Sequence, residues 1–427
     1  MKKISSLIFV FVLMICLKSS SQTLRKSGTL DHLELLKQQD GRIEQNMDAV
    51  ENNLQAFLSS DNSFKKLSTP VIVPVVVHVI WNTASQNISD AQVFSQIDVL
   101  NEDYFRLNPD TVNTPALFQS VAAGANIQFC LAQIDTNGLP FNGIHRVQTT
   151  VTSFTQNNNV KHTSTGGTDI WNPNQYLNMW ICNLSGGILG YTQFPGGPPS
   201  TEGVVILYNV FGRIGNLLSP FDKGRTTTQE VGHYFYLYPI ASFPCAGLNA
   251  NDCNAQGDKV CDTPPATQSF GCPPPTQNSC TETNPFPPPY TMDMPDMTSN
   301  FMGYSDDSCM NLFTQGQAAR MNATINSYYT WMFSTSLICQ PNTINENNPE
   351  TNIILFPTLL KDVLQIKSSA FIILNVVIID EMNKEAMRFS NLNQKEVHLN
   401  LSSLKQGIYF VEITINNNSV FRKILKI

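Results

Sequence analysis

Hydrophobic residues follow two periods along the first 340 residues, and each period predicts one type of element. Residues 71–80 (VIVPVVVHVI) form a nearly continuous β-branched run, which is typical of a strand buried on both faces. Further apolar runs predict strands at residues 127–134, 177–184 and 203–208. Behind Ser89 and Gln92, a pair that resembles a capping box, apolar residues recur at helical spacing at Val93, Ile97, Leu100 and Tyr104. Strands mixed with long helices predict an α/β or α+β domain over residues 69–340.

The segments on either side of this domain have different patterns. Residues 22–68 are polar with short amphipathic stretches, which predicts a helical, prosegment-like region. Residues 341–352 are polar and read as a linker. Residues 353–427 contain short alternating strands, such as 397–401 and 408–415, with an Asn-rich turn at 416–418. This last pattern predicts a small all-β sandwich.

Composition and charge narrow the class of protein. The chain has 427 residues, of which 42% are hydrophobic and 14% charged, so it is globular. Its formal net charge is -7 and it has no basic tract, which argues against a nucleic-acid partner. Lys2 and Lys3 precede an apolar run at 7–17 and small polar residues at 19–21, so residues 1–21 read as a secretory signal peptide. No other segment resembles a transmembrane helix.

The cysteines fit an exported protein. Setting Cys16 aside as part of the signal peptide leaves 10 − 1 = 9 cysteines in an oxidising context. Several crowd into a loop rich in Asn, Pro and Gly, at Cys245, Cys253, Cys261, Cys272 and Cys280. A loop of that composition has little hydrophobic core of its own, so we expect disulfides to stabilise it. A metal cluster is disfavoured because no CxxC pair is present. An odd count leaves one thiol unpaired.

The main candidate for chemistry is residues 226–239 (TTTQEVGHYFYLYP), which resemble a zinc-protease helix with ligands missing. The complete motif is H-E-x-x-H-x-x-G-x-x-H, in which two histidines one helical turn apart bind zinc and the glutamate deprotonates a metal-bound water. Here Gln229 replaces the first histidine, Tyr236 the glycine and Pro239 the third histidine. Only Glu230 and His233 remain.

These replacements predict that the zinc cofactor is absent. A catalytic zinc has three protein ligands and a water. The Gln229 amide is a far poorer ligand than imidazole, and Pro239 offers no side-chain donor. Without the metal, nothing lowers the pKa of the attacking water, so Glu230 has no nucleophile to make. We therefore predict that Glu230 is a relic, a solvated or hydrogen-bonded carboxylate in an old cleft, the alternative being a surviving general base. His233 is predicted to be hydrogen-bonded, the alternative being weak metal binding.

The remaining histidines carry no catalytic assignment. His78 lies in the first predicted strand and is expected to be a core residue. His145 and His162 lie in polar sequence with no partner at ligand spacing, and we assign them no role.

Several segments together resemble the pappalysin/cytophagalysin family of metzincin proteases, over roughly residues 24–340. These segments are PVVVHVI with SQIDVLNEDYFRLN, YLNMWICNLSGGILGYTQFPGG, GDKVCDTPP with GCPPP, and NFMGYSDDSCMNLFTQGQAARM. The resemblance implies a metzincin-like fold with a mixed sheet and an active-site helix. It also implies that Met302 underlies the zinc site in a Met-turn, and that Tyr304 assists the transition state.

The prosegment departs from the same family at a second position. Relatives commonly carry Arg-x-Cys-Gly, whose thiolate binds the latent zinc. The match here is RKSGT at residues 25–29, with Ser27 in place of the cysteine. Two separate parts of one mechanism are therefore missing.

The resemblance further implies disulfides and a cation site in the loop after the helix. It implies the pairs Cys253 with Cys280 and Cys272 with Cys309, and Cys245 with Cys261 is the pair then left over. Cys130 and Cys182 are bonded or merely buried, and Cys339 is our candidate for the unpaired thiol. Asp258, Asp262 and Thr263 match a family loop that can hold calcium, with a purely structural turn as the alternative.

Residues 353–427 resemble the C-terminal sorting domain of the type IX secretion system. The segments ILFPTLLKDVLQI and LSSLKQGIYFVEI…SVFRKILKI carry this resemblance, although residues 357–359 read Pro-Thr-Leu instead of Pro-Asn-Pro. It implies recognition by the type IX machinery and export across the outer membrane, to the cell surface or the medium.

Three functional hypotheses follow. The first is a secreted pseudoprotease, a metzincin-fold protein that lost zinc ligands at Gln229 and Pro239 and binds a peptide or a surface partner without cutting it. The second is an active zinc metalloendopeptidase with an atypical ligand set, completed by Gln229, a water or a residue distant in sequence. The third is a surface adhesion or binding scaffold, which predicts an exposed apolar patch away from the cleft.

Overall fold

The computed structural model describes residues 24–60, 70–241, 243–334, 353–356, 359–368, 371–380, 384–415 and 418–426. The predicted signal peptide with Cys16 and the predicted linker at 341–352 lie outside the described residues, and so do the predicted domain boundaries at 69 and 340.

The central element is a six-stranded mixed sheet. Its strands run in the order β3-β1-β5-β7-β6, and β4 also pairs with β1. Their bounds are β1 Val71–Trp81, β3 Ile127–Leu131, β4 Ile144–Gln148, β5 Leu177–Cys182, β6 Gly190–Thr192 and β7 Val204–Leu207. The strand pairs are parallel, except that β6 runs antiparallel to β7 at the edge. The four strands predicted from sequence are present, whereas β4 and β6 were not predicted.

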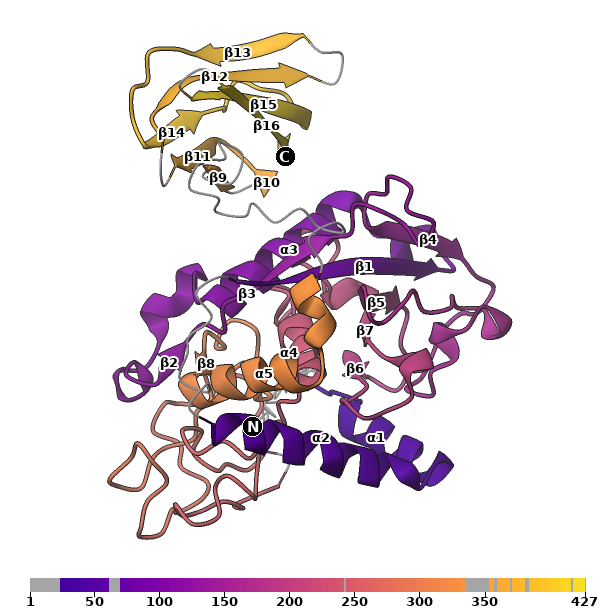
Figure 1. Cartoon of the computed structure of the whole chain (residues 1–427), viewed down its shortest axis with the longest axis vertical. Helices are drawn as coiled ribbons and strands as arrows, with labels where there is room; N and C mark the ends of the chain where they lie inside the picture. Colours follow the sequence, from indigo (N-terminus) through magenta and orange to yellow (C-terminus); the bar gives the residue numbers. More distant parts are fainter. Residues whose placement is uncertain are drawn as a thin grey trace, which may run out of the picture.

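Helices cover this sheet and precede it in the chain (Figure 1). They are α1 Thr29–Gln39, α2 Arg42–Leu58, α3 Asp90–Phe105, α4 Arg225–Tyr234 and α5 Gln315–Ser327, and a short pair of strands, β2 Ala122–Ala123 and β8 Phe313–Thr314, is separate from the main sheet. The Ser89 hydroxyl caps α3 by accepting from the Gln92 backbone N–H, as the sequence predicted. The Gln92 side chain, however, donates to the carbonyls of Tyr208 and Phe211, so only half of the capping box is formed.

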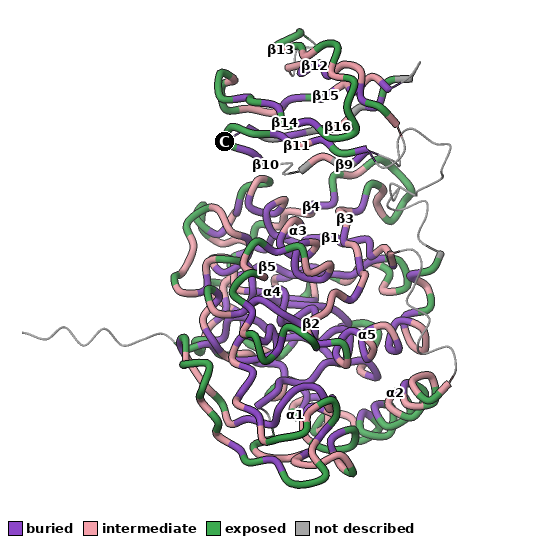
Figure 2. The backbone as a smooth tube through the Cα atoms, turned by 90° about the vertical axis from the view of Figure 1, so that its left-hand side faces the viewer, coloured by how far each residue is buried: buried purple, intermediate pink, exposed green. Residues whose placement is uncertain are grey.

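The main core lies between the sheet and helices α3, α4 and α5. The predicted helical positions Val93, Leu100 and Tyr104 are fully buried there against strand residues such as Val75 and Val77. The tube in Figure 2 is buried almost continuously through β1, β5 and α4. The α4 helix that carries the degenerate motif is therefore an internal helix, and every one of its residues is buried.

Residues 24–60, which we call the N-terminal arm, pack as two helices against the rest of this domain. The arm has its own apolar cluster, in which α2 residues such as Met47 and Leu54 contact Phe194, Tyr236 and Tyr238. Figure 1 shows α2 running alongside α5, and these two helices are in direct contact. Tyr234, Tyr236 and Tyr238 are all buried.

His78 is a core residue, as predicted, and it is hydrogen-bonded to a second histidine that sequence spacing did not single out. Its Nε2–H donates to Asn178 Oδ1 at 2.9 Å, and its Nδ1 lies 3.2 Å from His145 Nδ1. The parallel register of β1 and β4 places the two histidines side by side. Because Asn178 Oδ1 can only accept, the His78 proton is on Nε2, and in the neutral ring Nδ1 accepts a hydrogen bond from the His145 Nδ1–H. Burial lowers the pKa of His78 to about 3.

This lowered pKa predicts an acid-dependent contribution to stability. The folded-state pKa lies below the usual value of 6.5, so the contribution is complete above pH 6.5 and is lost as the pH falls toward 3. We expect the stability advantage of wild type over His78→Gln to shrink by roughly 3 kcal/mol between pH 7 and 4.5. Urea unfolding at several pH values measures this difference, and a pH-independent difference would contradict the assignment.

The C-terminal region forms two small sheets. One has the order β10-β16-β15-β12-β13 and the other β14-β11-β9. The strands are β9 Ile353–Phe356, β10 Leu359–Leu360, β11 Val363–Ser368, β12 Ile373–Asp380, β13 Glu385–Phe389, β14 Glu396–Asn400, β15 Gly407–Ile415 and β16 Asn418–Lys426. Burial alternates along β14, and one apolar cluster includes residues of both sheets, such as Leu364 and Val411. These features match the predicted all-β sandwich.

Two of the three predicted disulfide pairings in the loop after α4 are wrong. The structure pairs Cys245 with Cys280 and Cys253 with Cys261, and the predicted bond between Cys272 and Cys309 is present. Backbone hydrogen bonds between residues 249 and 259 close successive tight turns, and these bring residues 253 and 261 to a Cα separation of 5.0 Å.

The other cysteines are partly resolved by the structure. Cys130 is disulfide-bonded, and Cys182 is a free, buried thiol. Cys339, our candidate for the unpaired thiol, lies outside the described residues.

Candidate active site

The two surviving motif residues and Gln229 are all buried in α4. Gln229, Glu230 and His233 are each at most 1% exposed. The His233 Nδ1–H donates to the Leu237 carbonyl at 2.7 Å, so its Nε2 carries the lone pair. Burial lowers the pKa of His233, against the opposing effects of the Glu230 charge and the Leu237 carbonyl. His233 is thus a neutral imidazole oriented as metal ligands commonly are.

Gln229, at the position of the first zinc ligand, forms a structural hydrogen bond. The Gln229 Nε2–H₂ donates to the Gly303 carbonyl at 2.9 Å, so the amide joins α4 to the loop before β8. Among the described residues, His233 Nε2 has no hydrogen-bond partner, and none of them forms a group of three His, Cys, Asp or Glu side chains able to hold a metal. The motif positions around His233 therefore offer one imidazole and one neutral amide oxygen, which do not fit a catalytic zinc with three protein ligands.

At the C-terminus of α4, Tyr236 occupies the cap position where the zinc motif has a glycine. The Leu237 N–H donates to the Gly232 carbonyl at 3.0 Å and the Tyr236 N–H to the His233 carbonyl at 2.9 Å, which is a Schellman cap. Such a cap requires a left-handed residue, usually glycine, and Tyr236 occupies it with φ of 69°. A bulky residue in this conformation costs roughly 1–3 kcal/mol, so its side-chain contacts must offset that cost.

Met302 packs beneath α4. A Cβ placed on Gly232 would lie 2.5 Å from Met302 Sδ, which shows how closely the helix rests on this side chain. Met302 is fully buried, and its carbonyl accepts from the Ile240 N–H at 3.2 Å. These contacts give Met302 a packing role that does not depend on zinc.

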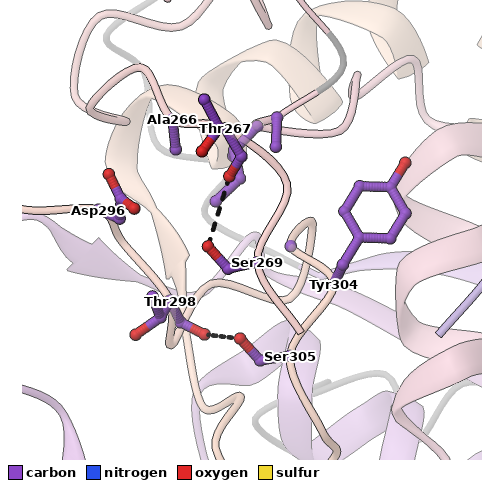
Figure 3. Close-up of a pocket in the computed structure, with 10 residues that line it drawn as sticks. Ala266, Thr267, Ser269, Asp296, Thr298, Tyr304 and Ser305 are labelled. Carbon is purple, nitrogen blue, oxygen red and sulfur yellow. Dashed lines mark hydrogen bonds between the residues drawn. The ribbon is translucent and has the colours of Figure 1, made fainter. Parts of the chain in front are cut away.

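Tyr304 lies at the rim of a pocket beside this turn (Figure 3). Figure 3 shows its ring extending away from Asp296 and Ser269, while the Ser305 hydroxyl donates to the Thr298 carbonyl at 2.7 Å. The pocket volume is about 10 Å³, which is at the lower limit for a single water. It is therefore too small for a peptide substrate.

Glu230 is covered by the N-terminal arm. Its Oε2 accepts from the Thr29 hydroxyl at 2.7 Å and from the Thr192 hydroxyl at 3.0 Å. Its Oε1 is buried without a hydrogen-bond partner among the described residues. Glu230 is therefore a hydrogen-bonded carboxylate, closed off from solvent by a residue of the arm.

The predicted calcium residues form a closely bonded turn. Asp258 accepts from the Thr263 hydroxyl at 2.7 Å and from the Val260 N–H at 3.1 Å. Asp262 accepts from the Thr314 hydroxyl at 2.6 Å and from the Gly316 N–H at 2.8 Å, at the start of α5. Burial raises the pKa of both carboxyls, that of Asp258 to about 7. Protein donors already engage all four carboxylate oxygens.

Sequence reasoning missed the residues that close the cleft. Thr29 was noted only as part of the altered prosegment motif, and the ion pair between Glu51 and Arg320 was not noted at all. The partners are 201 residues apart for Thr29 and Glu230 and 269 apart for Glu51 and Arg320. A signal for Thr29 existed, since it directly follows residues 25–28, the match to the prosegment motif.

Comparisons with known proteins agree with the class that this fold and helix define, a metzincin-type protease domain. The profile of the pregnancy-associated plasma protein-A family matches residues 159–326, and that of the secretion system C-terminal sorting domain matches residues 354–427. Extracellular metalloprotease 1 of Coccidioides posadasii is 30% identical over 283 residues, which cover 63% of this chain and 82% of that protein. An extracellular metalloprotease of Pyricularia oryzae is 28% identical over 278 residues, covering 63% and 80%.

Solved structures give the same result. A point mutant of promirolysin of Tannerella forsythia has 39% identity and a TM-score of 0.62, and the match covers 73% of this chain and 97% of that one. Mature mirolysin with a cleaved peptide has 43% identity and a TM-score of 0.54, with 63% and 96% covered. The chain belongs to the pappalysin family of metzincin metalloproteases.

The comparisons also establish localisation. The sorting domain and the extracellular relatives indicate export through the outer membrane, to the cell surface or the extracellular space. Within the part of the chain that the structure describes, no helix has the length and apolar character needed to cross a membrane.

Proposed function

We propose that this chain is an exported pseudoprotease, a metzincin-fold protein that has lost zinc-dependent hydrolysis. The observation that carries the proposal is the donor set around His233. Gln229 offers only a neutral amide oxygen, since its amide nitrogen donates to the Gly303 carbonyl, and Pro239 offers no side-chain donor. One imidazole lacks the affinity to retain a catalytic zinc, because even the loss of an outer-shell partner costs roughly 10–100-fold.

The same reasoning weakens the alternative of an active enzyme with an atypical ligand set. That alternative requires another side chain to complete the site beside His233 Nε2, and no described residue forms a hydrogen bond with this atom. Glu230, the residue that would activate water, is held by two hydroxyl groups. We assign Glu230 and Tyr304 vestigial roles, and we propose that the turn at Asp258, Asp262 and Thr263 is structural and not a calcium site.

The retained function of the cleft is peptide binding. A solved relative, mature mirolysin, is in complex with a cleaved peptide, which supports a peptide-binding cleft in this fold. In this chain the position beside Glu230 is filled by Thr29. A free peptide therefore binds only where the arm is displaced.

Metal analysis and cleavage assays test this proposal. Protein incubated with zinc and then dialysed is expected to retain much less than about one zinc per chain, the stoichiometry of an intact site. We also expect to see no peptide cleavage of the kind that both a chelator and Glu230→Gln abolish. Cleavage abolished by both would establish the enzyme alternative. Turnover that survives Glu230→Gln would identify a contaminating protease.

A further inference from the structure

We propose that His78 and His145 form a binding site for univalent copper, Cu(I), on the face of the sheet opposite the main core. The two histidines lie on the neighbouring strands β1 and β4, and neither belongs to α4 or to the zinc motif. The inference is therefore independent of whether the cleft hydrolyses peptides. Three features of the pair support it: the direction of the nitrogen lone pairs, the way the rings are held, and the kind of side chain around them.

The alternation of side chains along β1 directs His78 away from the main core. Val77 and Val79, on either side of it, belong to that core, and successive residues of a strand point to opposite faces of the sheet. The parallel register of β1 and β4 places His145 directly beside His78. His78 is fully buried, whereas His145 is partly exposed. An ion therefore reaches the pair from the side of His145.

The two Nδ1 atoms point at each other along one line. They are 3.2 Å apart, and the two ring centroids are 5.4 Å apart. The difference of 2.2 Å (5.4 − 3.2) is about twice the distance from an imidazole nitrogen to the centre of its own ring, so both nitrogens lie close to the line that joins the centroids. Imidazole is a good ligand for copper, and Cu(I) with two nitrogen ligands takes a linear geometry. The lone pairs of His78 and His145 already have this direction.

Binding of the ion replaces the hydrogen bond between the two rings. The proton on His145 Nδ1 moves to Nε2, which gives the other neutral tautomer, so that each Nδ1 has a lone pair for the ion. Bonds from a metal to imidazole nitrogens are about 2 Å long, so a linear unit needs the nitrogens to separate by less than about 1 Å. His145 is the ring that moves, because it is partly exposed.

His78 is held in the orientation of a metal ligand. Its Nε2–H donates to Asn178 Oδ1 at 2.9 Å, and metal-binding histidines commonly donate their second ring N–H in this way. Burial lowers the pKa of His78, so Nδ1 keeps its lone pair at neutral pH. Asn178 Oδ1 also accepts from the Trp171 N–H at 2.9 Å, and Asn178 Nδ2 donates to the Trp171 carbonyl at 2.9 Å. One amide thus positions both the ligand ring and the residue that carries the neighbouring indole.

The surroundings of the pair favour a univalent ion over a divalent one. The Trp171 ring centroid is 5.8 Å from the centroid of each imidazole, and Trp180 stacks on His78 at 5.3 Å. Indole faces attract cations within about 6 Å but supply no ligand atom. Among the described residues, no third His, Cys, Asp or Glu joins the pair, so a zinc ion lacks the three or four ligands it needs. A single positive charge shared by two imidazoles also costs less to bury than a double charge.

Competition with a chromophoric Cu(I) chelator tests the inference. The full chain is titrated with copper and ascorbate without oxygen, and the chelator reports the number of ions bound and their affinity. Wild type is expected to bind about one more Cu(I) per chain than His145→Gln. The glutamine amide still donates to His78 Nδ1, so this variant keeps the hydrogen bond and loses one ligand nitrogen. Its Cu(I) affinity is expected to fall by more than the roughly 10–100-fold that the loss of an outer-shell partner costs.

The matched control is His162→Gln, which removes a histidine whose side chain is 39% exposed and is expected to leave Cu(I) binding unchanged. Equal Cu(I) binding by wild type and His145→Gln would overturn the inference, and so would an equal loss in His162→Gln. The same titration with Zn²⁺ tests the choice of ion. About one Zn²⁺ per chain that His145→Gln removes would overturn the assignment to a univalent ion.

Discussion

Replacing Glu51 by glutamine is expected to lower the free energy of unfolding by roughly 3–5 kcal/mol. The reason is that Arg320, whose side chain is 1% exposed, would keep a buried charge without its bidentate partner. Urea unfolding followed by tryptophan fluorescence measures the loss. All four tryptophans, at residues 81, 171, 180 and 331, lie outside the sorting domain, so the signal reports the protease-like domain.

Two comparisons make this prediction specific. Glu44 has a side chain that is 74% exposed, and its carboxylate lies 3.9 Å from Lys37 Nζ. Glu44→Gln is expected to change the free energy of unfolding by less than about 0.5 kcal/mol. Combining Glu51→Gln with Arg320→Met removes both members of the pair and is expected to recover part of the loss. Equal effects of Glu51→Gln and Glu44→Gln would contradict a buried ion pair.

The pH dependence of the Glu51 effect has a defined sign. Burial raises the pKa of Glu51, but the hydrogen bonds and charge of Arg320 outweigh it and lower the pKa to about 2. Because the unfolded-state value is about 4.5, the stabilisation is complete above that pH and is lost as the pH falls toward 2. The difference between wild type and Glu51→Gln should therefore shrink in acid.

Much of the fold could be predicted because its signals are local. The β-branched run of β1 and the helical spacing behind Ser89 depend only on neighbouring residues, and both elements form as expected. The sequence analysis missed β4 and β6, each for a different reason. β4 is only partly buried and reads as polar loop, while β6 has three residues and includes a glycine.

The disulfide errors and the closed cleft share a cause. The path of the loop between residues 245 and 280 depends on successive turns, which spacing alone does not define, so two pairings were exchanged. Similarly, the motif shows that zinc ligands are missing at Gln229 and Pro239, but it does not show which residue lies in the cleft beside Glu230. The hydrogen bond between Thr29 and Glu230 joins an arm and a helix that only the folded chain brings together.

Restoring the missing ligands is expected to restore zinc binding. The change is Gln229→His combined with Pro239→His in the full chain. His233 already has its Nδ1–H on the Leu237 carbonyl and its Nε2 free of hydrogen bonds among the described residues, so one imidazole is correctly prepared. With two more imidazoles, the variant is expected to retain about one zinc per chain, and its zinc affinity should exceed that of wild type by roughly 100-fold or more.

Zinc binding and cleavage are expected to separate in this variant. The Thr29 hydroxyl holds Glu230, so the intact double variant should bind zinc without cutting peptides, and cleavage should begin only after the arm is nicked and displaced. Adding Glu230→Gln should leave zinc retention unchanged and prevent cleavage, because the carboxylate is the base in this mechanism. Elemental analysis and a fluorogenic peptide assay measure the two properties. Two outcomes would contradict this explanation: about one zinc per chain in wild type, or no zinc in the double variant. Either would show that the number of histidine ligands does not distinguish this chain from its proteolytic relatives.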